Sequence, residues 1–242
     1  MTVRECLLER GGLAVLVDPA RCTPTAAREL AARAADEGVV ALLLGDSFGA
    51  GDGAVAIARS LKAGAPLVPL LHFPATAAQL VADVDAVLLL SLVSGRNAQY
   101  LIEEHVRSVP FFARHPHIEV ISTAYCLVDG GTVTSVESVS QTRPLPSNKP
   151  ELVAAHIRAA SMIGMRAAYL DAGSGATMAV AAPLIRAARD ACEGPLFVGG
   201  GIRDAAGVRS AREAGADIVV VGTLLERQGP RVVRDLAIAA RS

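Results

Sequence analysis

Two short apolar runs near the end of the chain, each ending in glycine, constrain its fold more than any other feature. They are Phe197–Arg203 (FVGGGIR) and Asp217–Leu225 (DIVVVGTLL), and a helix-like stretch follows each of them. Glycines let a backbone come close to an anion, and the N–H groups at the start of the next helix point at it. This pattern is typical of the last two strands of a (β/α)8 barrel whose loops hold a phosphate.

The whole chain alternates strand-like apolar runs with helical stretches. Its 242 residues suit one barrel, a fold of typically about 250 residues. We therefore predict an α/β fold, a single (β/α)8 TIM barrel, with residues 1–242 as one domain. An open, doubly wound parallel sheet is the alternative, because a count of strands does not show closure. The expected strands are Leu13–Val17, Val39–Leu44, Pro66–Leu71, Ala86–Leu90, Ile118–Thr123, Ala167–Leu170, Leu196–Val198 and Ile218–Val221.

One segment interrupts the alternation after the fifth expected strand. In Tyr125–Val136, two β-like runs flank Asp129-Gly130-Gly131. An Asp-Gly turn between such runs is a hairpin signal. The sequence therefore predicts a β-hairpin insertion at this point.

Composition excludes several classes of protein. The formal net charge of −1 gives no electrostatic reason to expect a nucleic-acid partner. No apolar run reaches about 18 residues, and the first residues lack an apolar signal core, so neither a membrane span nor a secretory signal is expected. Four scattered cysteines without a C-x-x-C pair favour a reducing compartment. We expect a cytoplasmic protein.

Two aspartates end neighbouring expected strands and are candidates for a metal site. Asp18 is followed by Pro19, which restricts its backbone, and Asp46 ends the next strand. In proteins Mg²⁺ bridges a few carboxylate oxygens to substrate phosphates, and two adjacent carboxylates would repel each other without a cation. The alternatives are that Asp18 caps the helix beginning near Thr23 and that Asp46 stabilises a loop.

The end of the sixth strand carries a second set of candidates. Asp171 lies two residues after Tyr169 and directly before an Ala-Gly-Ser-Gly turn. A carboxylate there could accept a hydrogen bond from a substrate hydroxyl or act as a general base. Ser174 in the turn could bind a phosphate. A purely turn-stabilising role is the alternative for both residues.

At this point the motifs resemble a known family. The chain is similar, along nearly its whole length, to the geranylgeranylglyceryl phosphate synthase family, which includes the bacterial heptaprenylglyceryl phosphate synthases (the PcrB-like proteins). The glycine loops are shared by many phosphate-binding barrels, whereas the full set of motifs is specific. The segments that carry the resemblance are Leu88–Asn97, Glu119–Tyr125, Thr142–Pro146 with Lys149-Pro150, Tyr169–Gly175 and Val198–Arg203.

The resemblance implies a prenyltransferase that uses Mg²⁺. Members of the family join C1 of a polyprenyl diphosphate to a hydroxyl of sn-glycerol 1-phosphate, forming an ether bond and releasing pyrophosphate. The prenyl tail would lie in an apolar groove along the barrel, the lipid substrate implies contact with a membrane surface, and a homo-oligomer, usually a dimer, is expected. By resemblance, Asp18 and Ser47 lie near Mg²⁺ and the diphosphate, and Asp46, proposed above from its position after the second strand, is the further metal candidate beside them. Tyr169, Asp171, Gly173 and Ser174 contact the glycerol phosphate, with Tyr169 and Asp171 as the catalytic pair. Gly200, Gly201, Gly222 and Thr223 cradle the phosphate.

Three positions depart from the family pattern. Ala20 stands where the family usually has Asp, Asp46 where it has Gly, and Asp171 where Glu is common. Asp46 could restore the missing carboxylate, and the shorter Asp171 could fit another phosphorylated acceptor, such as 3-phosphoglycerate. An isomerase or lyase of the phosphate-binding barrels, using Asp18 with Asp171 as its acid–base pair, and a phosphate- or prenyl-binding protein without activity are the further alternatives.

Overall fold

Eight parallel strands close into a barrel in the computed structural model, which describes residues 1–45 and 53–241. Each strand pairs with the next in sequence, and β8 pairs in parallel with β1, with Leu13 opposite Val219. This closure confirms the (β/α)8 barrel and excludes the open, doubly wound sheet. The strands are β1 (Gly12–Val17), β2 (Ala41–Leu44), β3 (Leu70–His72), β4 (Ala86–Leu92), β5 (Glu119–Leu127), β6 (Ala167–Asp171), β7 (Leu196–Gly199) and β8 (Ile218–Val221).

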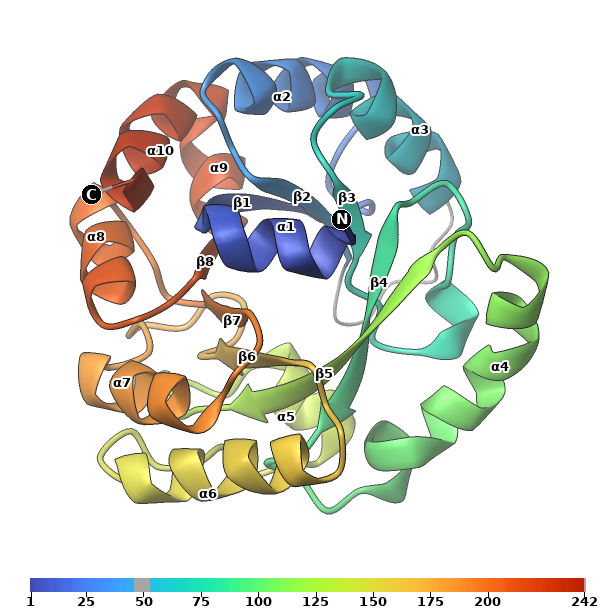
Figure 1. Cartoon of the computed structure of the whole chain (residues 1–242). Helices are drawn as coiled ribbons and strands as arrows, with labels where there is room; N and C mark the ends of the chain where they lie inside the picture. Colours follow the sequence, from blue (N-terminus) through green and yellow to red (C-terminus); the bar gives the residue numbers. More distant parts are fainter. Residues whose placement is uncertain (46–52, 242) are drawn as a thin grey trace.

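Helices surround the barrel on its outside (Figure 1). The sequence marks several of their starts: in α2, for example, Thr23 accepts a hydrogen bond from the Ala26 N–H at 3.3 Å and Pro24 takes the first helical position. None of the helices in the described ranges is long and apolar enough to cross a membrane. The helical elements are α1 (Val3–Arg10), α2 (Pro24–Asp36), α3 (Ala54–Gly64), η1 (Ala77–Gln79), the π-helical turn η2 (Gln99–Glu103), α4 (Glu104–Arg114), α5 (Ser135–Ser140), α6 (Pro150–Met162), α7 (Ala182–Ala191), α8 (Ala205–Glu213), α9 (Thr223–Gln228), η3 (Pro230–Val232) and α10 (Val233–Arg241).

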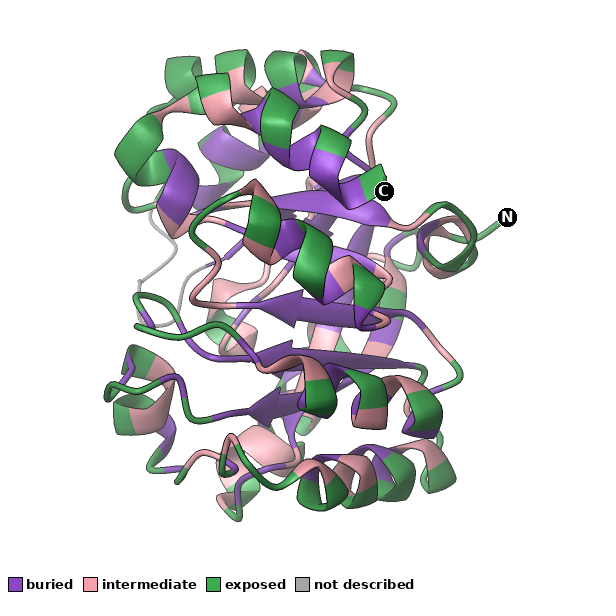
Figure 2. Ribbon diagram, turned by 90° about the vertical axis from the view of Figure 1, so that its left-hand side faces the viewer, coloured by how far each residue is buried: buried purple, intermediate pink, exposed green. Residues whose placement is uncertain are grey.

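The strands are buried on both faces, which gives the molecule two apolar layers. In β2, Leu42 and Leu44 pack outward toward the helices, whereas Ala41 and Leu43 belong to the cluster inside the barrel. Figure 2 shows the strands in purple, enclosed by helices whose outer faces are green. This two-sided burial explains why the strands are continuous apolar runs rather than alternating ones.

Helix α1 closes the amino-terminal end of the barrel and was not expected from the sequence. Leu7 is 1% exposed and joins the cluster inside the barrel. The carboxylate of Glu119, at the start of β5, accepts a hydrogen bond from the Val3 N–H at 2.5 Å and so caps the helix. In Figure 2 the helix lies at the right, beyond the amino ends of the strands.

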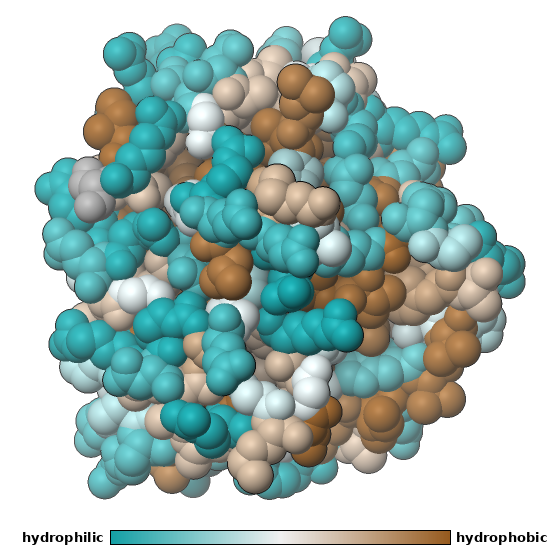
Figure 3. Space-filling model, viewed as in Figure 1, coloured by the Kyte–Doolittle hydropathy of each residue, from teal (hydrophilic) through white to brown (hydrophobic). Residues whose placement is uncertain are grey.

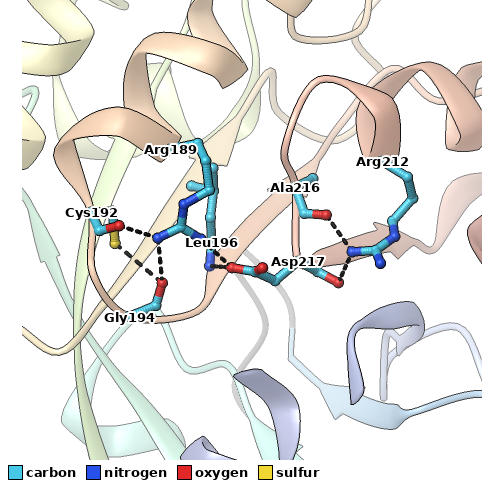
Figure 4. Close-up of polar contacts among 7 residues, drawn as sticks. All are labelled: Arg189, Cys192, Gly194, Leu196, Arg212, Ala216 and Asp217. Carbon is cyan, nitrogen blue, oxygen red and sulfur yellow. Dashed lines mark hydrogen bonds and ion pairs between the residues drawn. The ribbon is translucent and has the colours of Figure 1, made fainter. Parts of the chain in front are cut away.

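Ion pairs and hydrogen bonds also tie this end of the barrel together (Figure 4). Arg189 pairs with Asp217, whose Oδ2 also accepts a hydrogen bond from the Leu196 N–H at 2.8 Å. Arg212 donates to the carbonyl oxygen of Asp217 at 2.6 Å and to that of Ala216. These contacts join α7 and α8 to the amino ends of β7 and β8, the end of a barrel whose residues serve stability.

The predicted hairpin after β5 is wrong. The first half of Tyr125–Val136 continues β5, and the second half leads into helix α5, whose Thr134 cap accepts a hydrogen bond from the backbone N–H three residues on, at 3.3 Å. Val128 forms a parallel bridge with Leu145 instead of pairing across the Asp-Gly turn. The chain does bend at Asp129-Gly130-Gly131, but Val128 pairs with Leu145 rather than with a residue just after this bend.

Replacing Leu7 tests whether α1 is part of the barrel core. We expect Leu7→Ala to lower the free energy of unfolding by about 2 to 5 kcal/mol, because it leaves a cavity beneath the barrel. The matched control is Leu8→Ala, since Leu8 is 38% exposed, and its effect should stay below about 1 kcal/mol. Urea unfolding of both variants measures this, and equal losses would show that α1 contributes only as a surface helix.

Candidate active site

One cavity of about 750 Å³ opens at the carboxyl ends of the strands. This is the end at which barrel enzymes place their sites, and the volume suits a small-molecule ligand. The structure brings together all of the predicted site residues that lie within the described ranges. Those lining the cavity are Asp18, Tyr169, Asp171, Gly173, Ser174, Gly200, Gly201, Gly222 and Thr223. Asp46 and Ser47 lie outside the described residues.

The three glycines at the end of β7, Gly199, Gly200 and Gly201, allow the loop after β6 to come close. A Cβ atom on Gly199 would stand 2.4 Å from the Tyr169 hydroxyl, and one on Gly200 would stand 2.6 Å from Asp171 Oδ1. Gly201 has a φ of +70° and its Cβ would meet the Met178 carbonyl oxygen at 2.2 Å. The glycines therefore hold the phosphate-type loop directly against the two predicted catalytic side chains.

Several residues that line the cavity have a backbone N–H group without a backbone partner in the described part of the chain. Gly201, Gly222 and Thr223 are among them. The Ser174 and Thr223 hydroxyl oxygens lie 3.4 Å apart, so the loops after β6 and β8 meet here. Unpaired N–H groups and hydroxyls in one concave surface form a site for an anion such as a phosphate.

Asp171 is a buried carboxylate held at both oxygens. Its Oδ2 accepts a hydrogen bond from the Tyr125 hydroxyl at 2.5 Å, and its Oδ1 accepts one from the Gly173 N–H at 2.7 Å. Burial raises the pKa of the Asp171 carboxyl above its ordinary value, while these two hydrogen bonds oppose the rise. A carboxyl group with a raised pKa in a cavity suits proton transfer with a substrate hydroxyl.

Aromatic rings line the inner wall beside Asp171. The Tyr169 ring stacks between Phe73, at 4.9 Å between ring centroids, and Phe197, at 5.9 Å. Tyr125 completes the cluster at 5.6 Å from Tyr169. The Tyr169 hydroxyl donates no hydrogen bond within the described part of the chain, although the residue lines the cavity, so it is available to a ligand.

Asp18 lies at the rim and is the described residue that fits a metal best. Its side chain is 22% exposed, and Arg21 contacts it at 3.3 Å while also reaching Glu226 at 3.0 Å. No cluster of three or more His, Cys, Asp or Glu that could hold a metal ion occurs in the described ranges. One carboxylate at a phosphate cavity fits a Mg²⁺ that is completed by substrate oxygens, because this ion commonly uses one or two carboxylates and ligand phosphates.

Arginines at the rim were missed by the sequence reasoning. Arg203 and Arg227 are exposed, line the cavity and enter none of the ion pairs among the described residues. Guanidinium groups beside a phosphate site favour anionic ligands. Arg203 ends the glycine motif Phe197–Arg203 and could have been proposed from the sequence. Arg227 lies in no motif that points to the site.

His72, the one histidine at an expected strand end, has a structural role. It is buried, and its two ring nitrogens contact the carbonyl oxygens of Leu44, at 2.9 Å, and Gln79, at 3.0 Å. The imidazole therefore joins β2 and β3 to η1.

A second, small apolar cavity of about 70 Å³ adjoins the first. Leu90 and Leu92 of β4, with Val136 and Val139 of α5, give it an apolar lining. Phe73 borders both cavities, so an apolar pocket and a polar, anion-binding pocket meet at this ring.

The fold and these cavities define a phosphate-binding (β/α)8 barrel. The chain matches the PcrB family over residues 7–240 and belongs to it. It is 38% identical to a geranylgeranylglyceryl phosphate synthase of Spirosoma linguale, over 96% of this chain and 92% of that protein. It is 41% identical to the protein of the same name from Methanothrix thermoacetophila, over 93% of this chain and 88% of that one. The expectation of an enzyme of the prenyltransferase class is thereby confirmed.

A solved structure has the same fold. The (S)-3-O-geranylgeranylglyceryl phosphate synthase of Thermoplasma acidophilum, in complex with sn-glycerol-1-phosphate, superimposes with a TM-score of 0.92. The two chains are 24% identical, and the match covers 100% of this chain and 99% of the other. The barrel architecture is therefore shared over its full extent.

Titration of Asp171 should be visible in the stability of the protein. Because the pKa of this carboxyl is raised in the folded state, the folded protein holds the proton to higher pH than the unfolded chain does. The free energy of unfolding, relative to that of Asp171→Asn, is then expected to fall as pH rises from about 4 through the raised pKa. Chemical denaturation across this pH range measures the difference, and a difference that rises with pH would contradict a raised pKa.

Gly201 gives a test of the anion site. We expect Gly201→Ala to lower stability by about 1 to 3 kcal/mol and to weaken binding of inorganic phosphate about tenfold or more, because the methyl group displaces the loop. Gly207→Ala in α8 is the control, since its Cβ would make only ordinary contacts at 3.5 Å. Calorimetric titration with phosphate distinguishes them, and unchanged affinity in Gly201→Ala would place the anion elsewhere.

Proposed function

We propose that this protein transfers a polyprenyl group from a prenyl diphosphate to a hydroxyl of sn-glycerol 1-phosphate, forming an ether bond and releasing pyrophosphate. The observation that carries the proposal is the arrangement of its two cavities. A polar cavity with unpaired N–H groups and a buried carboxylate meets an apolar cavity at Phe73. A phosphorylated alcohol fits the first and the start of a hydrocarbon chain fits the second.

The acceptor side rests on the three loops after β6, β7 and β8. The N–H groups of Gly201, Gly222 and Thr223 bind the phosphate, and Ser174 adds its hydroxyl. Asp171, further inside, accepts a hydrogen bond from the acceptor's hydroxyl. The names of the curated relatives and of the Thermoplasma acidophilum complex with glycerol phosphate support this acceptor.

Charge favours glycerol phosphate over 3-phosphoglycerate. The hydroxyl-binding end of the cavity is a carboxylate, Asp171, in a buried setting. A second carboxylate brought next to it by 3-phosphoglycerate would repel it in this low-dielectric surrounding, whereas a neutral hydroxymethyl group would not.

The proposed reaction forms one bond at C1 of the prenyl chain and breaks one, and Asp171 takes up the proton that is released. The acceptor oxygen forms a bond to C1 of the prenyl chain, the bond from C1 to the diphosphate breaks, and pyrophosphate leaves with the electron pair. The hydroxyl proton passes to Asp171, and Tyr169 holds the acceptor oxygen by its free hydroxyl. The apolar walls around Phe73 keep water from the reacting carbon.

Mg²⁺ is part of the proposal. When bound, it would neutralise the negative charge that develops on the departing pyrophosphate. Asp18 would hold it, with Asp46 and Ser47 as further candidates outside the described residues. Arg21, which pairs with Asp18 and Glu226, orients these two carboxylates at the rim.

Contact with a membrane surface and assembly with a second copy stay predictions. Val133 is 71% and Met178 50% exposed, and the backbone of Met178 lies beside Gly201, which lines the cavity. The turn η2 exposes Ile102, and helix α4, which continues it, exposes Val106 and Val109. Figure 3 shows brown, hydrophobic atoms on the right, where Figure 1 draws this helix.

A coupled pyrophosphate-release assay with Mg²⁺ tests the proposed function. It crosses farnesyl, geranylgeranyl and longer diphosphates with glycerol 1-phosphate, glycerol 3-phosphate and 3-phosphoglycerate. Turnover with glycerol 1-phosphate and an ether-linked product are expected. Turnover with a different acceptor alone would reassign the substrate, and none with any pair would refute the proposed function.

A substitution of Asp18 tests its proposed role in holding Mg²⁺. We expect Asp18→Asn to lower kcat/KM about 100-fold or more, because loss of the metal carboxylate removes several kcal/mol of charge stabilisation. Asp83→Asn is the control: Asp83 forms a surface ion pair with Arg59 at 3.0 Å, outside both cavities, and its activity should stay within about twofold. Equal activity of both variants would remove Asp18 from the site.

A further inference from the structure

Tyr125 lines the apolar cavity and contacts a residue that lines the polar one, and the proposed function gives it no role. Its ring lines the apolar cavity, while its hydroxyl donates a 2.5 Å hydrogen bond to Asp171, which lines the polar one. In the β5–β6 pairing, Leu127 lies opposite Asp171, so Tyr125 stands two residues earlier in β5. Alternate residues of a strand share a face, so Tyr125 lies on the same face as Leu127, and Asp171 lies on that face as the partner of Leu127. The side chains of Tyr125 and Asp171 therefore both point into the barrel.

The contact fixes the direction of the Asp171 carboxylate. The Gly173 N–H occupies one site on Oδ1 and the Tyr125 hydroxyl one site on Oδ2. Each carboxylate oxygen accepts about two hydrogen bonds, so one site on each remains for a ligand. With both oxygens held, rotation of the carboxylate would break a hydrogen bond in a buried surrounding, which is costly.

The phenol is itself fixed in place. Its ring packs 5.9 Å from Phe73 and 5.6 Å from Tyr169, between ring centroids. Its backbone oxygen accepts a hydrogen bond from the Val93 N–H at 3.0 Å, which joins this position to the end of β4. Burial raises the pKa of Tyr125 well above its ordinary value, so the hydroxyl keeps its proton and remains the donor.

We propose that Tyr125 is a positioning residue: its hydroxyl holds the Asp171 carboxylate in the orientation that receives the acceptor's hydroxyl, and its ring forms the wall on the side of the apolar chain. This inference rests on the proposed function, because it takes Asp171 as the group that receives the acceptor's proton. Tyr125 itself neither gains nor loses a proton in the reaction. It links the site of the acceptor to the site of the chain through one rigid side chain.

The test compares Tyr125→Phe with Tyr100→Phe. Both changes remove the phenol hydroxyl of a residue that lines the apolar cavity, but only the Tyr125 hydroxyl contacts Asp171. The first measurement is an infrared titration of each protein without substrate, in which the band of the protonated Asp171 carboxyl is assigned by its loss in Asp171→Asn. The second is the pH profile of kcat and of KM for glycerol 1-phosphate, by pyrophosphate release.

We expect Tyr125→Phe alone to shift the Asp171 titration and the acid limb of kcat to higher pH by about one unit or more, since a hydrogen bond to the charged form is lost. Its kcat should fall about tenfold or more with a smaller change in KM. A titration that does not move, or moves equally in Tyr100→Phe, overturns the positioning role and leaves the proposed function intact. A titration shift in a protein that releases no pyrophosphate with any acceptor overturns the proposed function and, with it, the role of Tyr125 in catalysis.

Discussion

Pairing of β8 with β1 is the constraint on which the rest of the molecule depends. Closure places the carboxyl ends of all eight strands around one opening, so residues as far apart in sequence as Asp18 and Thr223 line the same cavity. The opposite end must then be sealed, because the barrel interior is apolar. Leu7 of α1 does this at the amino ends of the strands, and the Arg189–Asp217 ion pair holds α7 against the start of β8 at the same end. Stability and chemistry are thereby separated to the two ends of one sheet.

The second constraint is a charge inside this closed barrel. A carboxylate such as Asp171 is expensive to bury, and two donors, Tyr125 and Gly173, offset part of that cost. The opposing effects leave its pKa raised. The glycine after β7 is tied to the same point, since any side chain at Gly200 would strike the carboxylate. The glycine loop after β7 and the Asp171 carboxylate are therefore in direct contact, and a change to either would displace the other.

Features that depend on residues close together in the sequence could be predicted, whereas those that depend on contacts between distant residues could not. Strands were visible because burial on both faces makes them continuous apolar runs, and the register of a barrel then placed Asp18 and Asp171 at one opening without knowledge of any contact. Helix α1 was missed because only Leu7 of its eight residues is buried, which leaves no periodic pattern. The false hairpin had a valid turn, but its strand pairs with Leu145, a partner that no local signal specifies. The bond from Tyr125 to Asp171 spans 46 residues and depends on side-chain directions that appear only in the folded barrel.

The position of Phe73 gives the two cavities a chemical meaning that neither has alone. Under the proposed function, a hydrocarbon chain in the apolar cavity would end at this ring, and a phosphorylated alcohol in the polar cavity would meet it from the other side. The reacting carbon of the chain would then lie between an aromatic wall and a carboxylate, where few water molecules compete for it. A barrel that bound phosphate alone would have no use for an apolar pocket opening beside its buried carboxylate. This juxtaposition favours transfer between two substrates over isomerisation of one, and it explains why aromatic rings, scarce in this chain, are concentrated around Asp171.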